Sequence, residues 1–117
     1  MQLGVPKEIK AQEFRVGMTP AGVRELVSAG HTVLIESGAG EAIGLNDDLY
    51  RAAGASVVEP AEQIFAESDM VVKVKEPQPH ECRQLRPGQL LFTYLHLAAD
   101  PLQAELLMNS GATCIAY

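Results

Sequence analysis

The chain has 117 residues, a net charge of -6 and a hydrophobic content of 47%. This length indicates a single domain, 1–117, that can bury a core without help from metals or disulfides. The nine basic residues are dispersed, which argues against a nucleic-acid partner. The N-terminus lacks the pattern of a signal peptide, and no apolar run approaches the roughly 20 residues of a membrane helix. We therefore expect a cytoplasmic protein with no membrane partner.

The first half of the chain alternates strands and helices. Residues 3–6 form an apolar run that predicts the first strand. Thr19 and Pro20 predict a helix start, with Thr19 as the N-cap, and Gly30 predicts the end of that helix. The next predicted elements are a strand over 32–36, a glycine-rich turn, a short helix over 47–53 and a strand over 56–59.

The second half continues this alternation. Asp100 and Pro101 predict a helix start, Gln103 gives it the pattern of a capping box, and Gly111 predicts its end. The other predicted elements are a helix over 60–67, a strand over 70–75, one or two helical turns over 79–85, a strand over 89–95 and a strand over 113–117.

Strands that alternate with helices of this length predict an α/β fold of the Rossmann-like or flavodoxin-like kind. Its sheet should be mostly parallel and covered by helices on both faces. The sequence ends inside an apolar strand, so we expect the sheet to be incomplete at its C-terminus.

Candidate site residues follow from the rule that ligands bind at the carboxyl ends of parallel strands. Arg15 lies in the loop after the first strand, Lys73 and Lys75 end the strand over 70–75, and Tyr94 and His96 end the following one. A spacing of two puts each pair on one face of its strand. One of the two lysines is expected only to reach water. The pattern predicts a pocket for a small carboxylate.

The chemistry of these side chains fits a keto or amino acid. An arginine can bind a carboxylate through two parallel hydrogen bonds, and a lysine can polarise a ketone oxygen. A histidine can exchange a proton near neutral pH. Non-catalytic alternatives remain open: Arg15 is then a solvated loop residue, and His96 caps backbone groups.

Four other polar features are not expected to act in catalysis. His31 and His80 are expected to be structural or exposed. Cys82 and Cys114 match no metal spacing and are expected to be free thiols, with a disulfide as the alternative.

The glycine-rich turn over 38–44 resembles a dinucleotide fingerprint, but its third glycine comes one position late. No helix is expected to open directly behind it. We therefore interpret it as a tight structural turn, with no cofactor-binding or metal-binding residue assigned in this chain.

Several longer motifs resemble the alanine dehydrogenase and pyridine-nucleotide transhydrogenase family. They are Gly4-Val5-Pro6-Lys7-Glu8-Ile9-Lys10, Arg15-Val16, Thr19-Pro20-Ala21-Gly22, Glu36-Ser37-Gly38-Ala39-Gly40 and Ala53-Gly54-Ala55. Val74-Lys75-Glu76-Pro77 and Phe92-Thr93-Tyr94-Leu95-His96-Leu97-Ala98 are similar to alanine dehydrogenases in particular.

The resemblance implies the substrate domain of an enzyme that converts L-alanine, NAD and water to pyruvate, ammonia and NADH. It implies that Arg15 holds the substrate carboxylate, Lys75 binds and polarises the carbonyl oxygen, His96 is the general acid/base and Tyr94 lines the pocket. It also implies that NAD is bound by a Rossmann domain absent from this chain, that the enzyme forms a homo-oligomer, a hexamer, and that the 117 residues alone are inactive.

Two alternatives from other classes are weighed against this hypothesis. In a transhydrogenase alpha subunit the domain is mainly a scaffold, and Lys75 and His96 argue against it. A receiver-like or carboxylate-binding module is the non-enzymatic alternative. A receiver needs an aspartate cluster after its early strands, where this chain has Lys7 and Glu8.

Overall fold

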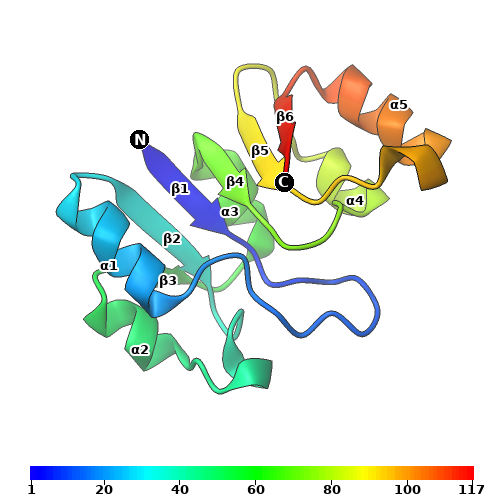
Figure 1. Ribbon diagram of the computed structural model, residues 1–117. Coiled ribbons are helices and arrows are strands. Elements are labelled where there is room, and N and C mark those ends of the chain that lie inside the picture. The colour runs from blue at the N-terminus through cyan, green and yellow to red at the C-terminus, as the bar shows by residue number, and fades with distance from the viewer.

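The computed structural model describes residues 1–117 as one six-stranded sheet in which every pair of neighbouring strands is parallel (Figure 1). The strand order is β3-β2-β1-β4-β5-β6. This is the doubly wound order, which reverses direction between β1 and β4. The strands are β1 (Gln2–Val5), β2 (Thr32–Glu36), β3 (Ser56–Val58), β4 (Met70–Val72), β5 (Leu90–Thr93) and β6 (Thr113–Ala116). The predicted α/β class is confirmed.

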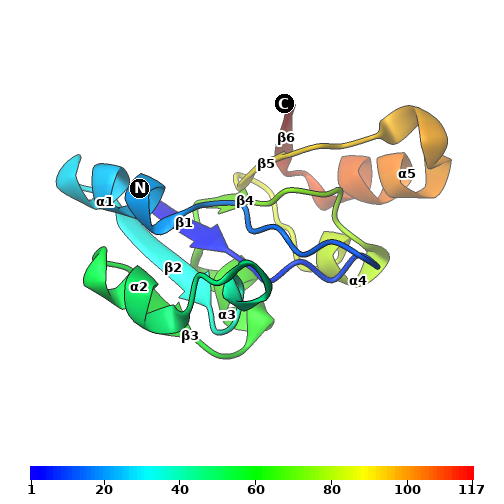
Figure 2. The same cartoon turned by 60° about the horizontal axis from the view of Figure 1, so that its bottom comes forward.

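Helices cover both faces of the sheet, as predicted. In Figures 1 and 2, α1 and α2 lie on one side of the strands, and α3 lies on the other. The helices are α1 (Pro20–Ser28), α2 (Asp47–Ala52), α3 (Ala61–Glu67), α4 (Pro79–Cys82) and α5 (Pro101–Ser110), with 3-10 turns η1 (Glu41–Ile43) and η2 (Leu97–Ala99). No helix is long and apolar enough to cross a membrane.

Two hydrophobic cores lie on the two faces because successive strand residues point to opposite sides. On β4, Val72 joins the core beneath α1 and α2, whereas Val71 joins the core beneath α3, α4 and α5. Gly4 of β1 lies against α3, where a Cβ atom would come within 1.9 Å of the Ser68 hydroxyl oxygen. A side chain at this position would push α3 off the sheet.

The predicted helix starts are present, with one difference. The Thr19 hydroxyl accepts from the Gly22 N–H at 3.3 Å, and the Asp100 carboxylate accepts from the Gln103 N–H at 3.1 Å. Gln103 does not complete a capping box, because its amide donates to the Leu95 carbonyl at 2.9 Å. This buried bond ties α5 to the loop that follows β5.

Two predicted strands end earlier than expected. We predicted strands over 70–75 and 89–95, but β4 ends at Val72 and β5 at Thr93. The N–H groups of Val74 and Lys75 donate to the Glu8 carboxylate and not to a neighbouring strand. The candidate site residues that follow these strands therefore lie on loops.

The two cysteines are free thiols, Cys82 at the end of α4 and Cys114 in β6. Cys82 is buried and Cys114 is partly buried. Burial raises the pKa of Cys82 to about 11 and also raises the pKa of Cys114. Both thiols are protonated at neutral pH and therefore unreactive.

Candidate functional site

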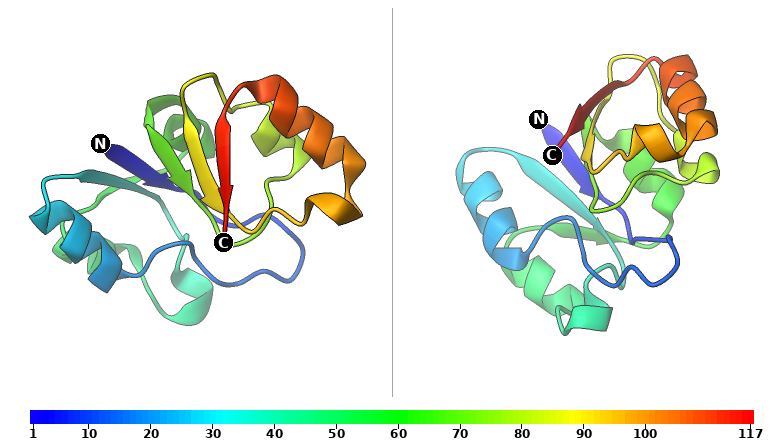
Figure 3. Two further views of the ribbon diagram at one scale, coloured as in Figure 1. Left: turned by 45° about the horizontal axis from the view of Figure 1, so that its top comes forward. Right: turned by 45° about the vertical axis from the view of Figure 1, so that its right-hand side comes forward.

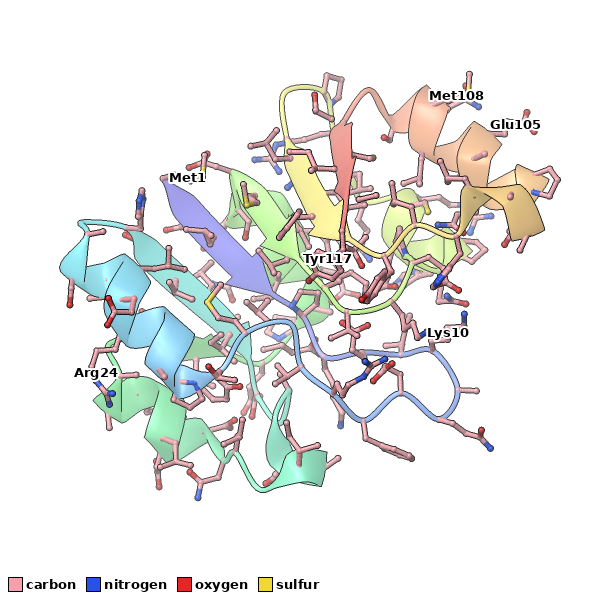
Figure 4. All side chains as sticks on the ribbon, in the orientation of Figure 1. Met1, Lys10, Arg24, Glu105, Met108 and Tyr117 are labelled. Carbon is pink, nitrogen blue, oxygen red and sulfur yellow. The ribbon has the colours of Figure 1, made fainter.

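The candidate site lies at the carboxyl ends of β1, β4 and β5, next to the reversal in strand order. The long loop between β1 and α1 runs past the ends of β4 and β5 (Figure 3). Lys10 on this loop and Tyr117 after β6 are labelled in Figure 4 and lie toward this edge of the sheet. Segments distant in sequence therefore contribute to one region.

Arg15 is held by Glu13, two residues earlier. Its Nε and Nη2 atoms donate to the two Glu13 oxygens at 3.0 and 2.8 Å. The Arg15 side chain is 59% exposed, whereas Glu13 is only 6% exposed. The hydrogen bond from Arg15 lowers the Glu13 pKa to about 2. Arg15 is thus exposed, but its guanidinium plane is fixed, and its Nη1 atom makes no hydrogen bond within the chain.

Lys73 does not belong to the site. We expected the lysine outside the site to reach water, and this expectation is wrong because Lys73 is buried. Its side chain is 1% exposed, and its ammonium lies 3.2 Å from a carboxylate oxygen of Glu8 and 3.2 Å from one of Glu81. A buried ammonium needs such partners because it has lost its hydration. Lys73 is a core residue that joins the loop after β1 to α4.

Of the two lysines that follow β4, Lys75 is the one whose ammonium remains available. Glu8 accepts its N–H at 3.0 Å, and its carbonyl accepts from the Thr93 hydroxyl at 2.9 Å. No hydrogen bond or ion pair occupies its ammonium. After the Arg15 hydrogen bonds, the charge of Lys75 also contributes to the low pKa of Glu13. The free ammonium therefore lies near the Glu13–Arg15 pair.

Tyr94 and His96 lie side by side, with ring centroids 5.8 Å apart and planes 16° apart. Tyr94 also packs edge-on against Tyr117 at 4.7 Å. The Tyr117 hydroxyl donates to the Lys73 carbonyl at 2.6 Å. This aromatic row links the ends of β4, β5 and β6.

His96 is further held by Glu76, whose Oε2 lies 2.8 Å from the His96 Nδ1. The other Glu76 oxygen pairs with the Lys10 ammonium. Burial works to raise the Glu76 pKa, but the hydrogen bonds from Lys10 and His96 outweigh it and bring that pKa to about 2. A charged glutamate thus joins the loop after β1 to the loop after β5.

Sequence reasoning missed the three glutamates that hold these groups. Glu13 holds Arg15, Glu8 holds the Lys75 backbone, and Glu76 holds His96. Only Glu13 could have been paired with its partner from sequence, since it lies two residues from Arg15. The other two act across 67 and 20 positions.

The largest cavity, about 320 Å³, lies beside this cluster and not within it. Arg15 and Glu13 line it, together with the turn that follows β2, but Lys75, Tyr94 and His96 do not. The candidate residues therefore form an open wall, with Arg15 at the border of the cavity.

The glycine-rich turn does not fit a dinucleotide. The Asp47 carboxylate accepts from the Ser37 hydroxyl at 2.6 Å and from the Gly38 N–H at 2.8 Å. A carboxylate thus takes the backbone donor that a phosphate would need, and its charge repels one. The 3-10 turn η1 follows directly, whereas we expected no helix there. With only three residues, η1 supplies no helix N-terminus long enough to bind a phosphate. The turn is structural.

The low pKa values of Glu13 and Glu76 predict how stability depends on pH. Both lie near 2 in the folded chain and at about 4.5 in the unfolded one, so their contribution is complete above pH 4.5. It should be lost as the pH falls from 4.5 towards 2, and the melting temperature of the chain should fall with it.

Glu13→Gln and Glu76→Gln should each make this fall less steep in a series of thermal melts. Glu62→Gln is the control, because Glu62 is 67% exposed and contacts neither Arg15 nor His96. An unchanged slope in both test variants would contradict the assignment.

Comparisons with known proteins agree with this architecture. Residues 4–117 match the family described as alanine dehydrogenase/PNT, N-terminal domain. Over all 117 residues the chain is 51% identical to an alanine dehydrogenase of Mycobacterium tuberculosis and 50% identical to that of Bacillus subtilis. It covers 32% and 31% of their lengths, so it spans about a third of these relatives.

Two solved structures match the fold over nearly the whole chain. An L-alanine dehydrogenase matches with a TM-score of 0.96 and 56% identity, covering 100% of this chain and 32% of that one. A transhydrogenase from Sinorhizobium meliloti matches with a TM-score of 0.92 and 26% identity, covering 99% of this chain and 34% of that one.

Fold and site together define a doubly wound α/β domain with basic groups at its ligand-binding edge. The chain belongs to the alanine dehydrogenase/PNT family, and its length and position correspond to the N-terminal domain of an alanine dehydrogenase.

Proposed function

We propose that this chain is the substrate-binding domain of an NAD-dependent L-alanine dehydrogenase. The observation that carries the proposal is the set of two cationic groups and one imidazole, from Arg15, Lys75 and His96, on the loops that follow β1, β4 and β5. Each is held in place by a different glutamate, yet each keeps free nitrogen atoms. A small keto or amino acid matches this set.

Each group has a role that follows from its chemistry. Arg15 binds the substrate carboxylate through Nη1 and the second N–H of Nη2, the donors that Glu13 leaves free. Lys75 donates to the carbonyl oxygen of pyruvate and stabilises the negative charge that develops there. His96 exchanges a proton with the oxygen that is added or lost at C2. Tyr94 closes one side of the pocket.

The cofactor belongs outside this domain. NAD accepts the hydride from C2 of the substrate, and the glycine-rich turn does not fit its pyrophosphate, since Asp47 accepts the Gly38 N–H. The remaining two thirds of a full-length enzyme would supply the cofactor site. Without it, this chain orients no hydride acceptor against the substrate and should be inactive alone.

Two further properties are proposed from the family. The full-length protein is a homo-oligomer, a hexamer by resemblance, and it acts in the cytoplasm on the small molecules L-alanine and pyruvate. Light scattering of the full-length protein would give its mass directly.

The test is turnover by the two-domain enzyme, made from the chain's own full-length gene or as a chimera. The chimera joins residues 1–117 to the remainder of the Mycobacterium tuberculosis alanine dehydrogenase. We expect NADH to form from L-alanine and NAD, and to be consumed with pyruvate and ammonia. The isolated chain should show neither reaction. A two-domain enzyme that does not oxidise L-alanine, or an isolated chain that does, would contradict the proposal.

A further inference from the structure

His96 is held in one orientation by contacts on two sides. Its backbone adopts the left-handed conformation, with φ 51° and ψ 40°, which is uncommon for a residue with a side chain. Its ring stacks on Tyr94, and its Nδ1 atom lies 2.8 Å from Glu76. The side chain is nevertheless 47% exposed. Its contact with Glu76 uses Nδ1, and the remaining ring nitrogen, Nε2, makes no hydrogen bond within the chain.

The contact with Glu76 determines which nitrogen carries the proton. Glu76 is 11% exposed and its pKa of about 2 keeps it ionised at neutral pH. An ionised carboxylate only accepts hydrogen bonds, so Nδ1 must be the donor. In the neutral imidazole this leaves the lone pair on Nε2.

Lys10 fixes the carboxylate in turn. Its ammonium, which can only donate, pairs with the other oxygen of Glu76. The two oxygens of one carboxylate therefore serve two different donors, one from the loop after β1 and one from the loop after β5.

We propose that Glu76, backed by Lys10, is the positioning residue of His96 and sets the tautomer that presents an unprotonated Nε2 at the site. The consequence for catalysis rests on the proposed function. When water adds to C2 of the iminium form of the oxidised substrate, the C2–O bond forms, and the C=N π pair moves to nitrogen and neutralises its positive charge. The water proton passes to Nε2. In the reverse direction the nitrogen lone pair re-forms the C=N bond as the C2–O bond breaks, and Nε2 returns that proton to the departing hydroxyl group, which leaves as water.

Nitrogen-15 NMR of the histidine rings in the 117-residue chain tests the positioning role without any turnover. At a pH above the ordinary histidine pKa of about 6.5, the His96 proton should reside on Nδ1. A free imidazole favours Nε2, and His80 should follow that preference because its only partner, Glu62, lies 3.8 Å from its Nε2 and both side chains are exposed. A wild-type His96 with its proton on Nε2 would overturn the proposal.

Glu76→Gln sharpens the test because Lys10 dictates how the new amide is oriented. The amide oxygen must face the Lys10 ammonium, so the NH₂ group faces Nδ1 and the His96 proton should move to Nε2. In the double variant Lys10→Met with Glu76→Gln, the amide is free to turn, and part of the signal should return to the Nδ1–H form. Glu62→Gln is the control and should leave His96 unchanged. If the His96 proton stays on Nδ1 in both test variants, Glu76 does not set the tautomer.

The same variants give a kinetic readout in the two-domain enzyme. Glu76→Gln should lower kcat about 10- to 100-fold with little change in KM, a part of the about 10²–10⁴-fold that general acid–base catalysis contributes. The double variant should recover some of this loss, which a merely structural role would not predict. If the wild-type enzyme does not oxidise L-alanine, the proposed function fails while the NMR result for Glu76 stands. If the wild type is active and the variants match it, Glu76 has no catalytic consequence.

Discussion

Lys75→Met in the two-domain enzyme should lower kcat for pyruvate reduction by at least about 100-fold, as expected for the loss of one group that stabilises a developing oxyanion. Of the two lysines that follow β4, Lys75 alone has an ammonium that no carboxylate of the chain has already paired. Methionine keeps a similar length and apolar stem, so the variant removes the charge and the donor and little else. The measurement is steady-state turnover with pyruvate, ammonia and NADH.

Two controls separate this effect from a loss of structure. The backbone bonds of Lys75 to Glu8 and Thr93 survive any side-chain change, so the melting temperature of the variant should stay close to that of the wild type. Arg24→Met removes one positive charge from the exposed surface of α1, far from Lys10 and Tyr117 (Figure 4), and should leave kcat unchanged. Turnover at the wild-type rate in Lys75→Met would remove Lys75 from the mechanism.

The fold was predictable because its signals are local. Thr19 and Asp100 cap the helices that follow them, and strands of apolar residues alternate with those helices along the whole chain. These signals depend only on residues that lie a few positions apart in the sequence. The parallel sheet follows from the length of the connections, since a helix between two strands returns the chain to its starting side.

The ends of the strands were less predictable because they depend on distant partners. Residues 73–75 have the alternating pattern of a strand, and the Lys73 N–H still donates to Phe92 of β5. The Glu8 carboxylate, however, takes the N–H groups of Val74 and Lys75 across more than sixty positions. Glu8 also distinguishes the two lysines, which look alike in the sequence, because it pairs with the Lys73 ammonium but only with the Lys75 backbone. Nothing near Lys73 indicates that Glu8 and Glu81 will enclose it, and nothing near Lys75 indicates that its ammonium stays free. Only the packing of the loop after β1 against α4 tells them apart.

Lys73→Met should therefore have the opposite profile to Lys75→Met, with a large loss of stability. It removes the ammonium that lies 3.2 Å from both Glu8 and Glu81 and leaves two buried carboxylates facing each other. Removing one partner of a buried ion pair costs about 3–5 kcal/mol, a large share of the roughly 5–15 kcal/mol that stabilises a typical domain. Urea denaturation of the 117-residue chain measures this loss directly.

The triple variant Glu8→Gln, Lys73→Met, Glu81→Gln distinguishes charge from packing as the cause. Neutral amides fill nearly the same space and can still bind backbone N–H groups, so much of the stability lost in Lys73→Met should return. If the triple variant is as unstable as Lys73→Met, the defect lies in packing around the methionine and not in the two uncompensated charges. If Lys73→Met is as stable as the wild type, the ion cluster does not hold the loop after β1 against α4. The rigid support that Glu8 gives to the Lys75 backbone would then need another source.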